Sequence, residues 1–360
     1  MNAAIISLGS VSSKLTFEAM KKYFDEVDFI NLKNVEVNLG HTKKENRESV
    51  LVDGEPIKKY DCIYAKGSFR YNTILRAITT ALKKDTYFPL VGSAYTIGHD
   101  KLLTHIKLQE IGIPMPGTYL SSSTIAAKSL LERINYPIIM KLPQGTQGKG
   151  VLFAESFPAA SSILDTLTSL KQPFIIQEYI ETDSTDLRAF VIGDKVVGAM
   201  KRRAVKGEKR SNIHAGGHGE KAILDSKTKK IAVSAAKALG CGICGVDILE
   251  SVKGPVVIEL NLSPGLQGLM TATNDDIPDK IGKYLYEQTT TFKGGKEDVS
   301  AKQILDDIGV EKIGNEIIST LDFRGERILL PKIVTQISKI QEGTEYVISL
   351  EKNSVKIKKM

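Results

Sequence analysis

Apolar and polar positions along the first hundred residues form the pattern of a small α/β unit. Short apolar runs of this kind form parallel core strands, and apolar side chains at helical spacing mark amphipathic helices. The expected elements are strands at 3–8 and 61–67, helices at 15–24 and 72–84, and a strand, turn and strand within 35–57. We therefore predict an N-terminal α/β domain over residues 1–98.

The next two hundred residues alternate helices with paired strands. The first helix is expected at 101–110. Gly112 stops it, and two prolines then force the chain into an extended conformation. The further elements expected are helices at 124–134, 159–170, 227–239 and 277–290, hairpins at 137–154, 185–203 and 245–262, and a strand at 173–180. The pattern predicts a second domain over residues 99–292.

A linker and a small appendage are expected at the C-terminal end. The segment KGGKED, residues 293–298, separates the second domain from a β-rich unit over 299–360. Two paired strands are expected at the end of that unit. The fold class predicted from these patterns is α/β (α+β).

Three glycines and two lysines follow a short apolar strand within ten residues. The strand ends in Lys141, and the glycines are Gly145, Gly148 and Gly150, with Lys149 between the last two. Glycines let a ligand approach the main chain closely, so the segment predicts a phosphate-binding hairpin. A P-loop is excluded, because proline stands where its first glycine belongs and because a strand pattern follows the glycines.

The segment GCGICG, residues 240–245, matches the dinucleotide-binding pattern G-x-G-x-x-G. That motif leaves a strand and opens a helix, whereas here a helical pattern precedes the glycines and a strand pattern follows. We therefore expect a tight helix-to-strand turn in which Cys241 and Cys244 are small filling residues rather than a redox or metal pair. The three cysteines of the chain cannot build a disulfide framework, in agreement with a reducing compartment.

Two carboxylates and an amide are expected on one face of the hairpin at 245–262. If its strands join through a five-residue turn at 251–255, Asp247 lies opposite Glu259, and Asn261 lies on the same side. Like charges in directly opposed positions are destabilising. The set suits a hard cation, and magnesium that carries nucleotide phosphates is its usual occupant. A chance pair on an exposed face and raised carboxyl pKa values for acid–base work are the alternatives.

The net charge of +7 leaves nucleic acid and acidic substrates open as partners. Six cations and one glutamate fall within residues 201–210. A solvated charge run is the ordinary explanation of such a stretch, but the flanking motifs favour a binding role. The N-terminus carries no basic lead segment, and its apolar run is too short for a signal peptide or a membrane helix. We expect a cytoplasmic protein without a membrane partner.

Several motifs follow one another in a recognisable order. They are Lys101, Lys141 with GTQGKG, IIQEYI, DLRAFVIG, the basic KRR…RSN loop and VDIL…VVIELNLSPG. Together they resemble the ATP-grasp fold, and RRAVKGEKRSNIHAGG with NLSPGLQG is similar to the RimK-type α-L-glutamate ligases. The resemblance covers about residues 1–290 and is strongest over 99–270. It implies that the second domain, 99–292, has two nucleotide-binding lobes, about 99–180 and 181–292.

The resemblance implies a site for ATP and two magnesium ions, with manganese as the alternative metal. Lys101 and Lys141 would contact the phosphates, the glycine hairpin would close over them, and the backbone of residues 178–180 would bind adenine. The implied nucleotide-binding residues are Lys101, Lys141, Gly145, Gln147, Gly148, Gly150, Glu178, Tyr179, Ile180, Asp186, Arg210, Ser211 and Asn212. The implied metal ligands are Asp247, Glu259 and Asn261.

The resemblance also implies an ADP-forming ligase that joins a carboxylate to an amine. An acceptor carboxylate attacks the γ-phosphate of ATP, and the amino group of L-glutamate then takes the acyl phosphate. The candidates for holding the acyl phosphate and the substrate carboxylates are Arg188, Lys201, Arg203 and Arg210, because a guanidinium fork suits both groups. The acceptor would be a protein C-terminus or a coenzyme, and a carrier protein of lysine biosynthesis is the alternative. We expect a homo-oligomer.

Two parts of the chain depart from the RimK pattern. The segment AKGSFRYN, residues 65–72, differs from the expected motif, although Arg70 and Asn72 follow a strand and would line an acceptor pocket there. The tail beyond about 300 is extra to the ligase core and faintly resembles the AbrB-type DNA-binding hairpin. Nucleic-acid binding is therefore a rival function for that unit, and a packing or oligomerisation role is the simpler explanation.

Overall fold

The computed structural model of the chain describes residues 1–40, 46–145, 150–203 and 218–307, and shorter segments beyond them. The shorter segments are 312–313, 316–317, 322–325, 327–329, 345–351 and 354–359. The chain divides into two compact units, Met1–Phe292 and Lys293–Met360. None of the helices in these ranges is long and apolar enough to cross a membrane.

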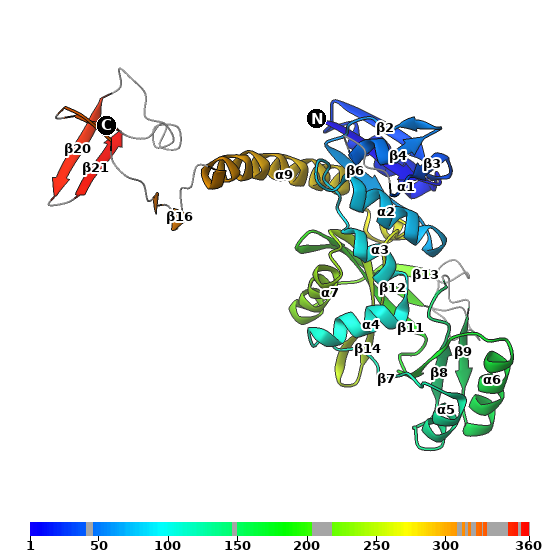
Figure 1. Ribbon diagram of the computed structural model, residues 1–360. Coiled ribbons are helices and arrows are strands. Elements are labelled where there is room, and N and C mark those ends of the chain that lie inside the picture. The colour runs from blue at the N-terminus through cyan, green and yellow to red at the C-terminus, as the bar shows by residue number, and fades with distance from the viewer. Residues whose placement is uncertain are drawn as a thin grey trace. The chain divides into compact units, whose positions relative to one another are not determined.

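The N-terminal part of the first unit is built on a three-stranded parallel sheet, drawn in blue in Figure 1. The sheet has the order β2-β1-β6, with β1 at Asn2–Ser7, β2 at Glu26–Asn31 and β6 at Cys62–Ala65. The apolar runs at 3–8 and 61–67 thus form the parallel core strands that their composition predicts. Residues 3–6 of β1 are fully buried, as expected for a parallel strand covered on both faces.

Helices and a small second sheet complete this part of the chain. The helices are α1 (Val11–Met20) and α2 (Asn72–Leu82), with 3-10 turns at Leu32–Asn34, Asn46–Ser49 and Phe69–Tyr71. An antiparallel sheet of β3 (Val35–Val37), β4 (Val50–Val52) and β5 (Glu55–Pro56) lies within the segment expected as strand, turn and strand.

A four-stranded antiparallel sheet forms the next part, drawn in green in Figure 1. Its order is β7-β10-β8-β9, with β7 at Thr118–Tyr119, β8 at Ile138–Lys141, β9 at Val151–Ala154 and β10 at Ile175–Glu178. Helices α5 (Thr124–Leu131) and α6 (Phe157–Ser169) pack against it. Their shared core includes Leu131, Leu164, Met140 and Ile176. Helices α3 (Gly92–Gly98) and α4 (Lys101–Glu110) lead into this lobe.

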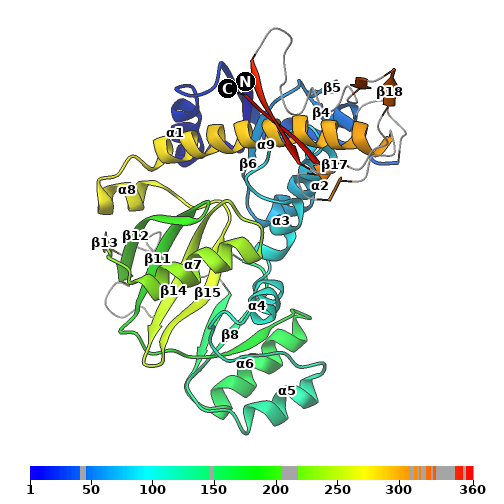
Figure 2. The same ribbon diagram turned by 90° about the vertical axis from the view of Figure 1, so that its left-hand side faces the viewer.

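The second lobe is a five-stranded antiparallel sheet of the order β13-β12-β11-β14-β15. The strands are β11 (Thr185–Ile192), β12 (Lys195–Arg203), β13 (His218–Lys221), β14 (Ile243–Ser251) and β15 (Gly254–Asn261). Helix α7 (Ser226–Ala238) covers one face of this sheet (Figure 2).

The helices that follow differ in length from those expected. Helix α8 spans Gln267–Thr273, and α9 spans Ile277–Asp307 instead of ending near residue 290. Residues 293–298, which we expected to be a linker, are therefore helical. The short strands beyond are β16 (Lys312–Ile313), β17 (Glu316–Ile317), β18 (Asp322–Arg324), β19 (Arg327–Leu329), β20 (Tyr346–Glu351) and β21 (Ser354–Lys359). The last two pair antiparallel, as expected for the end of the chain.

The β14–β15 hairpin contains a bulge that simple alternation does not predict. Asp247 pairs with Glu259 as expected, but Ile248 pairs with Val257, so that Ile258 is an extra residue. The strands consequently meet at Ser251 and Gly254, and the turn between them is tighter than the five-residue turn expected. A bulge bends its strand and reverses the faces of the residues beyond it.

The segment GCGICG forms the helix-to-strand turn that its flanks predict. Gly240 follows α7 with a φ of +67°, a conformation that favours glycine. The amide of Gly242 donates to the carbonyl oxygen of Pro89 at 2.6 Å, so the two backbones approach closely. Cys241 is a buried free thiol in this turn, and Cys244 is a buried free thiol at the start of β14.

Replacing Gly242 by alanine is expected to destabilise the fold. A Cβ atom there would lie 2.7 Å from the Pro89 carbonyl oxygen and 2.6 Å from the Tyr284 hydroxyl. We expect Gly242→Ala to lower the free energy of unfolding by about 1–3 kcal/mol, as overpacked cores do. Gly265→Ala is the control, because its Cβ would meet nothing within 4 Å. Equal denaturation midpoints for the two variants would contradict this account of the close approach.

Candidate active site

Charged and amide side chains from four neighbouring strands share one face of the five-stranded sheet. The register sets Asp186 opposite Arg202, and Arg188 opposite Asp247, which in turn lies opposite Glu259. Directly opposed residues of antiparallel strands point to the same face, and side chains two apart on a strand do so as well. The polar residues of this face are Asp186, Arg188, Arg202, Asp247, Glu259 and Asn261.

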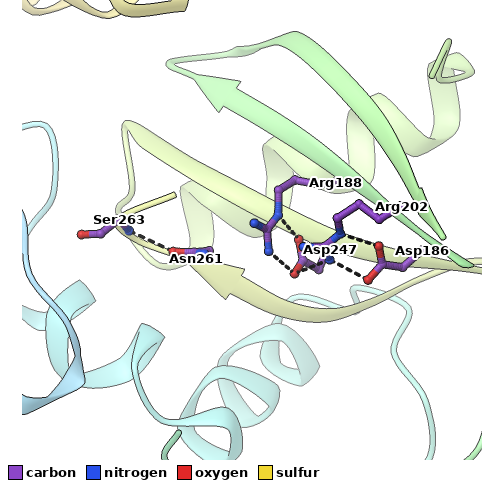
Figure 3. Close-up of polar contacts among 6 residues, drawn as sticks. All are labelled: Asp186, Arg188, Arg202, Asp247, Asn261 and Ser263. Carbon is purple, nitrogen blue, oxygen red and sulfur yellow. Dashed lines mark hydrogen bonds and ion pairs between the residues drawn. The ribbon is translucent and has the colours of Figure 1, made fainter. Parts of the chain in front are cut away.

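Asp247 is the centre of this cluster. Its carboxylate accepts hydrogen bonds from Arg188 Nε at 2.7 Å and Arg188 Nη2 at 2.6 Å, and it lies 2.9 Å from Arg202 Nη2. Figure 3 shows the two guanidinium groups converging on it from neighbouring strands. Burial to 1% exposure would raise the pKa of Asp247, but the two arginines hold that pKa below its ordinary value. Asp247 is therefore ionised and both arginines are held in place.

Arg202 is almost completely buried and pairs with two carboxylates. It donates to Asp186 Oδ1 through Nε at 2.6 Å and to Asp186 Oδ2 through Nη2 at 2.5 Å. Asp186, one of the nucleotide-binding residues that the resemblance implies, is thus buried against Arg202. This ion pair fixes β11 and β12 beside Asp247.

Glu259 has the opposite environment. Burial and the neighbouring Asp247 raise the pKa of its carboxyl group, although Lys101, Arg188 and Lys141 act in the other direction. Among the described residues its carboxylate has no hydrogen-bond or ion-pair partner. A carboxylate that faces a second carboxylate without a partner of its own favours binding of a cation.

The donor set fits a hard cation through two carboxylates and an amide. Asn261 Oδ1 accepts from the Ser263 amide at 3.1 Å and keeps a second lone pair. A carboxylate offers about four acceptor sites, of which the arginines take three on Asp247. Within the described ranges no cluster of three His, Cys, Asp or Glu side chains has metal-binding geometry. A metal here would therefore rest on Glu259 and Asn261, with Asp247 contributing its remaining site.

The first lobe contributes two lysines. Lys101 donates from Nζ to the Gly145 carbonyl oxygen at 3.1 Å, and Lys141 donates to Gln177 Oε1 at 2.6 Å. Burial lowers the pKa of Lys141 to about 8, against the pull of Glu259. Gly145 and Gly150 both have positive φ, as a tight hairpin requires. Gln147 and Gly148 lie outside the described residues.

A chain of hydrogen bonds that begins at Lys141 and Gln177 links the first lobe to the second. Gln177 Nε2 donates to Thr118 Oγ1 at 2.8 Å, and Thr118 Oγ1 lies 3.2 Å from His105 Nδ1. His105 Nε2 lies 3.1 Å from the carbonyl oxygen of Ile258, the bulge residue. A carbonyl oxygen only accepts, so Nε2 carries the proton, and burial lowers the pKa of His105 to about 4, which keeps the ring neutral.

The segment expected to bind adenine follows β10. The Glu178 carboxylate is exposed and accepts from the Gly117 amide at 3.1 Å, and Ile180 is partly buried. The Tyr179 ring stands edge-on to Phe153 with centroids 5.0 Å apart. The backbone of residues 178–180 leaves the four-stranded sheet and leads into β11, the strand that carries Arg188.

Other candidate residues lie elsewhere. Lys201 and Arg203 point to the opposite face of β12 from Arg202, and Lys201 pairs with Glu250 at 3.1 Å. Arg70 is exposed and Asn72 begins α2. Arg210, Ser211 and Asn212 lie outside the described residues. Of the cations proposed to hold the acyl phosphate, only Arg188 is brought to the cluster among those that the structure describes.

Several functional candidates escaped the motif analysis. Arg202 was passed over in favour of its neighbours, although its side of the strand faces Asp186 and Asp247. Gln177 lies in IIQEYI, of which only residues 178–180 were expected to bind the nucleotide, and His105 lies in the helix that begins at the candidate Lys101. Lys66, at the end of β6, also escaped, although a lysine that closes an apolar strand was a signal present in the sequence.

Comparison with known proteins identifies the family of the chain. The profile of the RimK-like ATP-grasp domain matches residues 98–285. A probable alpha-L-glutamate ligase of Vibrio cholerae is 36% identical over 277 residues, which are 76% of this chain and 91% of the relative. A probable alpha-L-glutamate ligase of Methanococcoides burtonii has the same identity and coverage.

Solved structures agree on the fold. The ATP-grasp ligase PsnB, complexed with minimal precursor, Mg and ADP, has a TM-score of 0.62 at 20% identity over 80% of this chain and 98% of its own. D-alanine–D-alanine ligase from Bacillus anthracis has a TM-score of 0.58 at 16% identity, covering 82% and 99%. The chain therefore belongs to the RimK-like ATP-grasp family and is an ATP-dependent carboxylate–amine ligase.

Proposed function

We propose that the chain activates an acidic acceptor as an acyl phosphate and joins it to the amino group of L-glutamate. One observation carries the proposal: Arg188 and Asp247 adjoin Glu259, and Lys101 and Lys141 are close enough to oppose the rise in the pKa of Glu259 that burial and Asp247 cause. Phosphate-binding cations, a candidate metal carboxylate and a carboxylate-binding arginine thus meet in one place. The relatives named alpha-L-glutamate ligase support glutamate as the amine, and a PsnB structure with a precursor peptide supports a peptide acceptor.

In this proposal two displacements follow one another. An oxygen of the acceptor carboxylate attacks the γ-phosphorus of ATP, and the bond to the bridging oxygen of ADP breaks. The glutamate nitrogen then attacks the acyl carbon, and inorganic phosphate leaves with the acceptor's oxygen. Catalysis of such steps depends on positioning and on neutralising charge.

The chain's own cations do most of this work. Lys101 and Lys141 bind the nucleotide phosphates, and the glycine hairpin brings its amides to them. Arg188 commits Nε and Nη2 to Asp247, so Nη1 is left to hold the oxygens of the phosphoryl group or the acyl phosphate. Asp247 thereby fixes the direction from which Arg188 approaches the substrate.

Magnesium bound by Glu259, Asn261 and Asp247 would add positive charge against the phosphate oxygens. Two ions are part of the proposal, and a metal titration of the nucleotide-bound protein would count them. Binding of one ion or of none would revise this part of the proposal without touching the ligase class.

The function is tested with purified protein, ATP, magnesium and labelled L-glutamate in a cell extract. We expect ADP and labelled product to appear together. Label in protein identifies a protein-modifying ligase, and label in small molecules identifies coenzyme modification. Labelled product with another amino acid but none with glutamate would contradict glutamate as the amine.

Replacing Glu259 by glutamine is expected to stop ligation without unfolding the protein. The variant keeps the shape of the side chain but removes its charge, so we expect kcat to fall by about a hundredfold or more, as for the loss of a major electrostatic contact. Because the pKa of Glu259 is raised in the fold, the variant is expected to be at least as stable as the parent without metal.

The matched control is Glu250→Gln, which removes a carboxylate from the opposite face of the same sheet. We expect near-parental turnover from it. Turnover that is unchanged in Glu259→Gln, or equally reduced in both variants, would remove Glu259 from the site.

The pH dependence of ATP use reports Lys141. Its pKa of about 8 lies below the ordinary value of 10.5, so the group loses its charge as pH rises through 8. Since kcat/KM reports the free enzyme, kcat/KM for ATP is expected to fall above about pH 8. Lys141→Arg keeps its charge and is expected to move this fall to higher pH. An unmoved profile would assign the titration to another group.

A further inference from the structure

Lys66 is a buried cation that the reaction described above does not use. Its side chain follows directly on β6 and is only 4% exposed. Its nearest recorded partner is the ring of Tyr64, whose centroid lies 5.2 Å from Nζ. In the ranges that the structure describes, the ammonium has no hydrogen bond and no carboxylate partner.

The environment of Lys66 is costly for a charge. Burial alone accounts for the lowering of its pKa to about 8, and no neighbouring carboxylate opposes that shift. Lysine is rarely this buried without a paired anion, because its desolvation is not repaid. An anion that arrives with the substrate would supply the missing partner.

Lys66 lies at the carboxyl end of β6, at an edge of the sheet where ligands bind in folds of this kind. β1 pairs in parallel with β2 on one side and with β6 on the other, so the order in which strands join the sheet reverses between β1 and β6. Ligands of open α/β sheets bind outside the carboxyl ends of the strands at such a switch point. The Lys66 amide donates to the Ile6 carbonyl oxygen at 2.8 Å, which places Lys66 beside Ser7 at that edge.

This edge is joined to the candidate active site. The Gly67 amide donates to Ser263 Oγ at 3.2 Å, and Ser263 Oγ lies 3.2 Å from the Gly67 carbonyl oxygen. The Leu266 amide donates to Ser12 Oγ at 2.9 Å. The loop that begins at Asn261, a candidate metal ligand, is thus held against the residue that follows Lys66.

Lys66 approaches the site from the side opposite the nucleotide lobe. Figures 1 and 2 both place the N-terminal sheet and the four-stranded sheet on opposite sides of the five-stranded sheet. Lys101 and Lys141, the candidate phosphate ligands, belong to the four-stranded side. An anion at Lys66 is accordingly a group of the acid substrates rather than a phosphate of ATP.

We propose that Lys66 binds a carboxylate of the substrate, at the carboxyl edge of the N-terminal sheet. This inference rests on the proposed function, because a ligase of glutamate and an acidic acceptor handles carboxylates that do not react. Two sources carry this chemistry, the amino acid and the acceptor. The two sources differ in one group: the amino acid must carry a free amine, whereas the acceptor does not need one.

The first arm of the test measures stability of the full chain. Lys66→Met removes an unpaired buried charge and keeps the length of the side chain, so its Tm is expected to equal or exceed that of the parent. Lys84→Met, at an exposed position of the same domain, is the control for the change in net charge. A Tm several degrees below the parent, or failure to fold, would make Lys66 a structural residue and overturn the proposal.

The second arm measures binding by the shift in Tm with two probes, L-glutamate and N-acetyl-L-glutamate. The parent and Lys84→Met are expected to be stabilised by at least one probe, and Lys66→Met is expected to lose that shift. A shift with L-glutamate alone names the amino acid as the source, and a shift with the acetylated probe names the acceptor. A parent that responds to neither probe, or a variant that keeps the response, overturns the proposal.

The third arm separates this proposal from the proposed function. In the ligation assay Lys66→Met is expected to raise KM for one acid substrate by about 10- to 100-fold, as for the loss of a charged hydrogen bond, with KM for ATP unchanged. A carboxylate response that is lost in Lys66→Met while the parent ligates nothing would uphold the Lys66 site and overturn the proposed function. If the parent ligates and Lys66→Met leaves KM unchanged for every acid substrate, the proposed function is upheld and the Lys66 site is overturned.

Discussion

One buried carboxylate, Asp247, orders the polar face of the five-stranded sheet. It is ionised only because Arg188 and Arg202 surround it, and neither arginine would lie in this geometry without it. Removing one member of such a set leaves an uncompensated buried charge, which costs more than the pair itself contributes. The orientation of Arg188 follows from this arrangement, and so does the like charge that Glu259 faces across the strand.

Two bulges decide which side chains reach that face. In the β11–β12 hairpin the register shifts between Phe190 and Val191, and this shift turns Arg202 toward Asp186. A regular hairpin with a turn at Gly193 would have set Lys201 there instead. In β15 the extra residue is Ile258, whose carbonyl oxygen meets His105. The bulge thus links the second lobe to the lysine of the first through one line of hydrogen bonds.

Much of the fold followed from local patterns. The glycine hairpin after Lys141, the turn at 240–245 and the opposition of Asp247 and Glu259 depend on spacing and chain geometry that neighbouring residues determine. Local patterns did not predict that Arg202, rather than Lys201 or Arg203, faces Asp247, because the bulge that decides this depends on packing across the sheet. The hydrogen-bond line through His105 joins residues more than a hundred positions apart. The burial of Lys66 is a property of the folded interior that composition does not reveal.

The central claim is that the acceptor's own carboxylate oxygen attacks the nucleotide. It is tested most directly with the acceptor that supports ADP formation, purified and labelled with oxygen-18 in its carboxyl group. After one turnover with ATP and L-glutamate, the inorganic phosphate is analysed by mass spectrometry. The account predicts one oxygen-18 atom in each phosphate formed with ligated product. Phosphate without the label, released together with ADP and product, would contradict an acyl phosphate and the site built around Asp247.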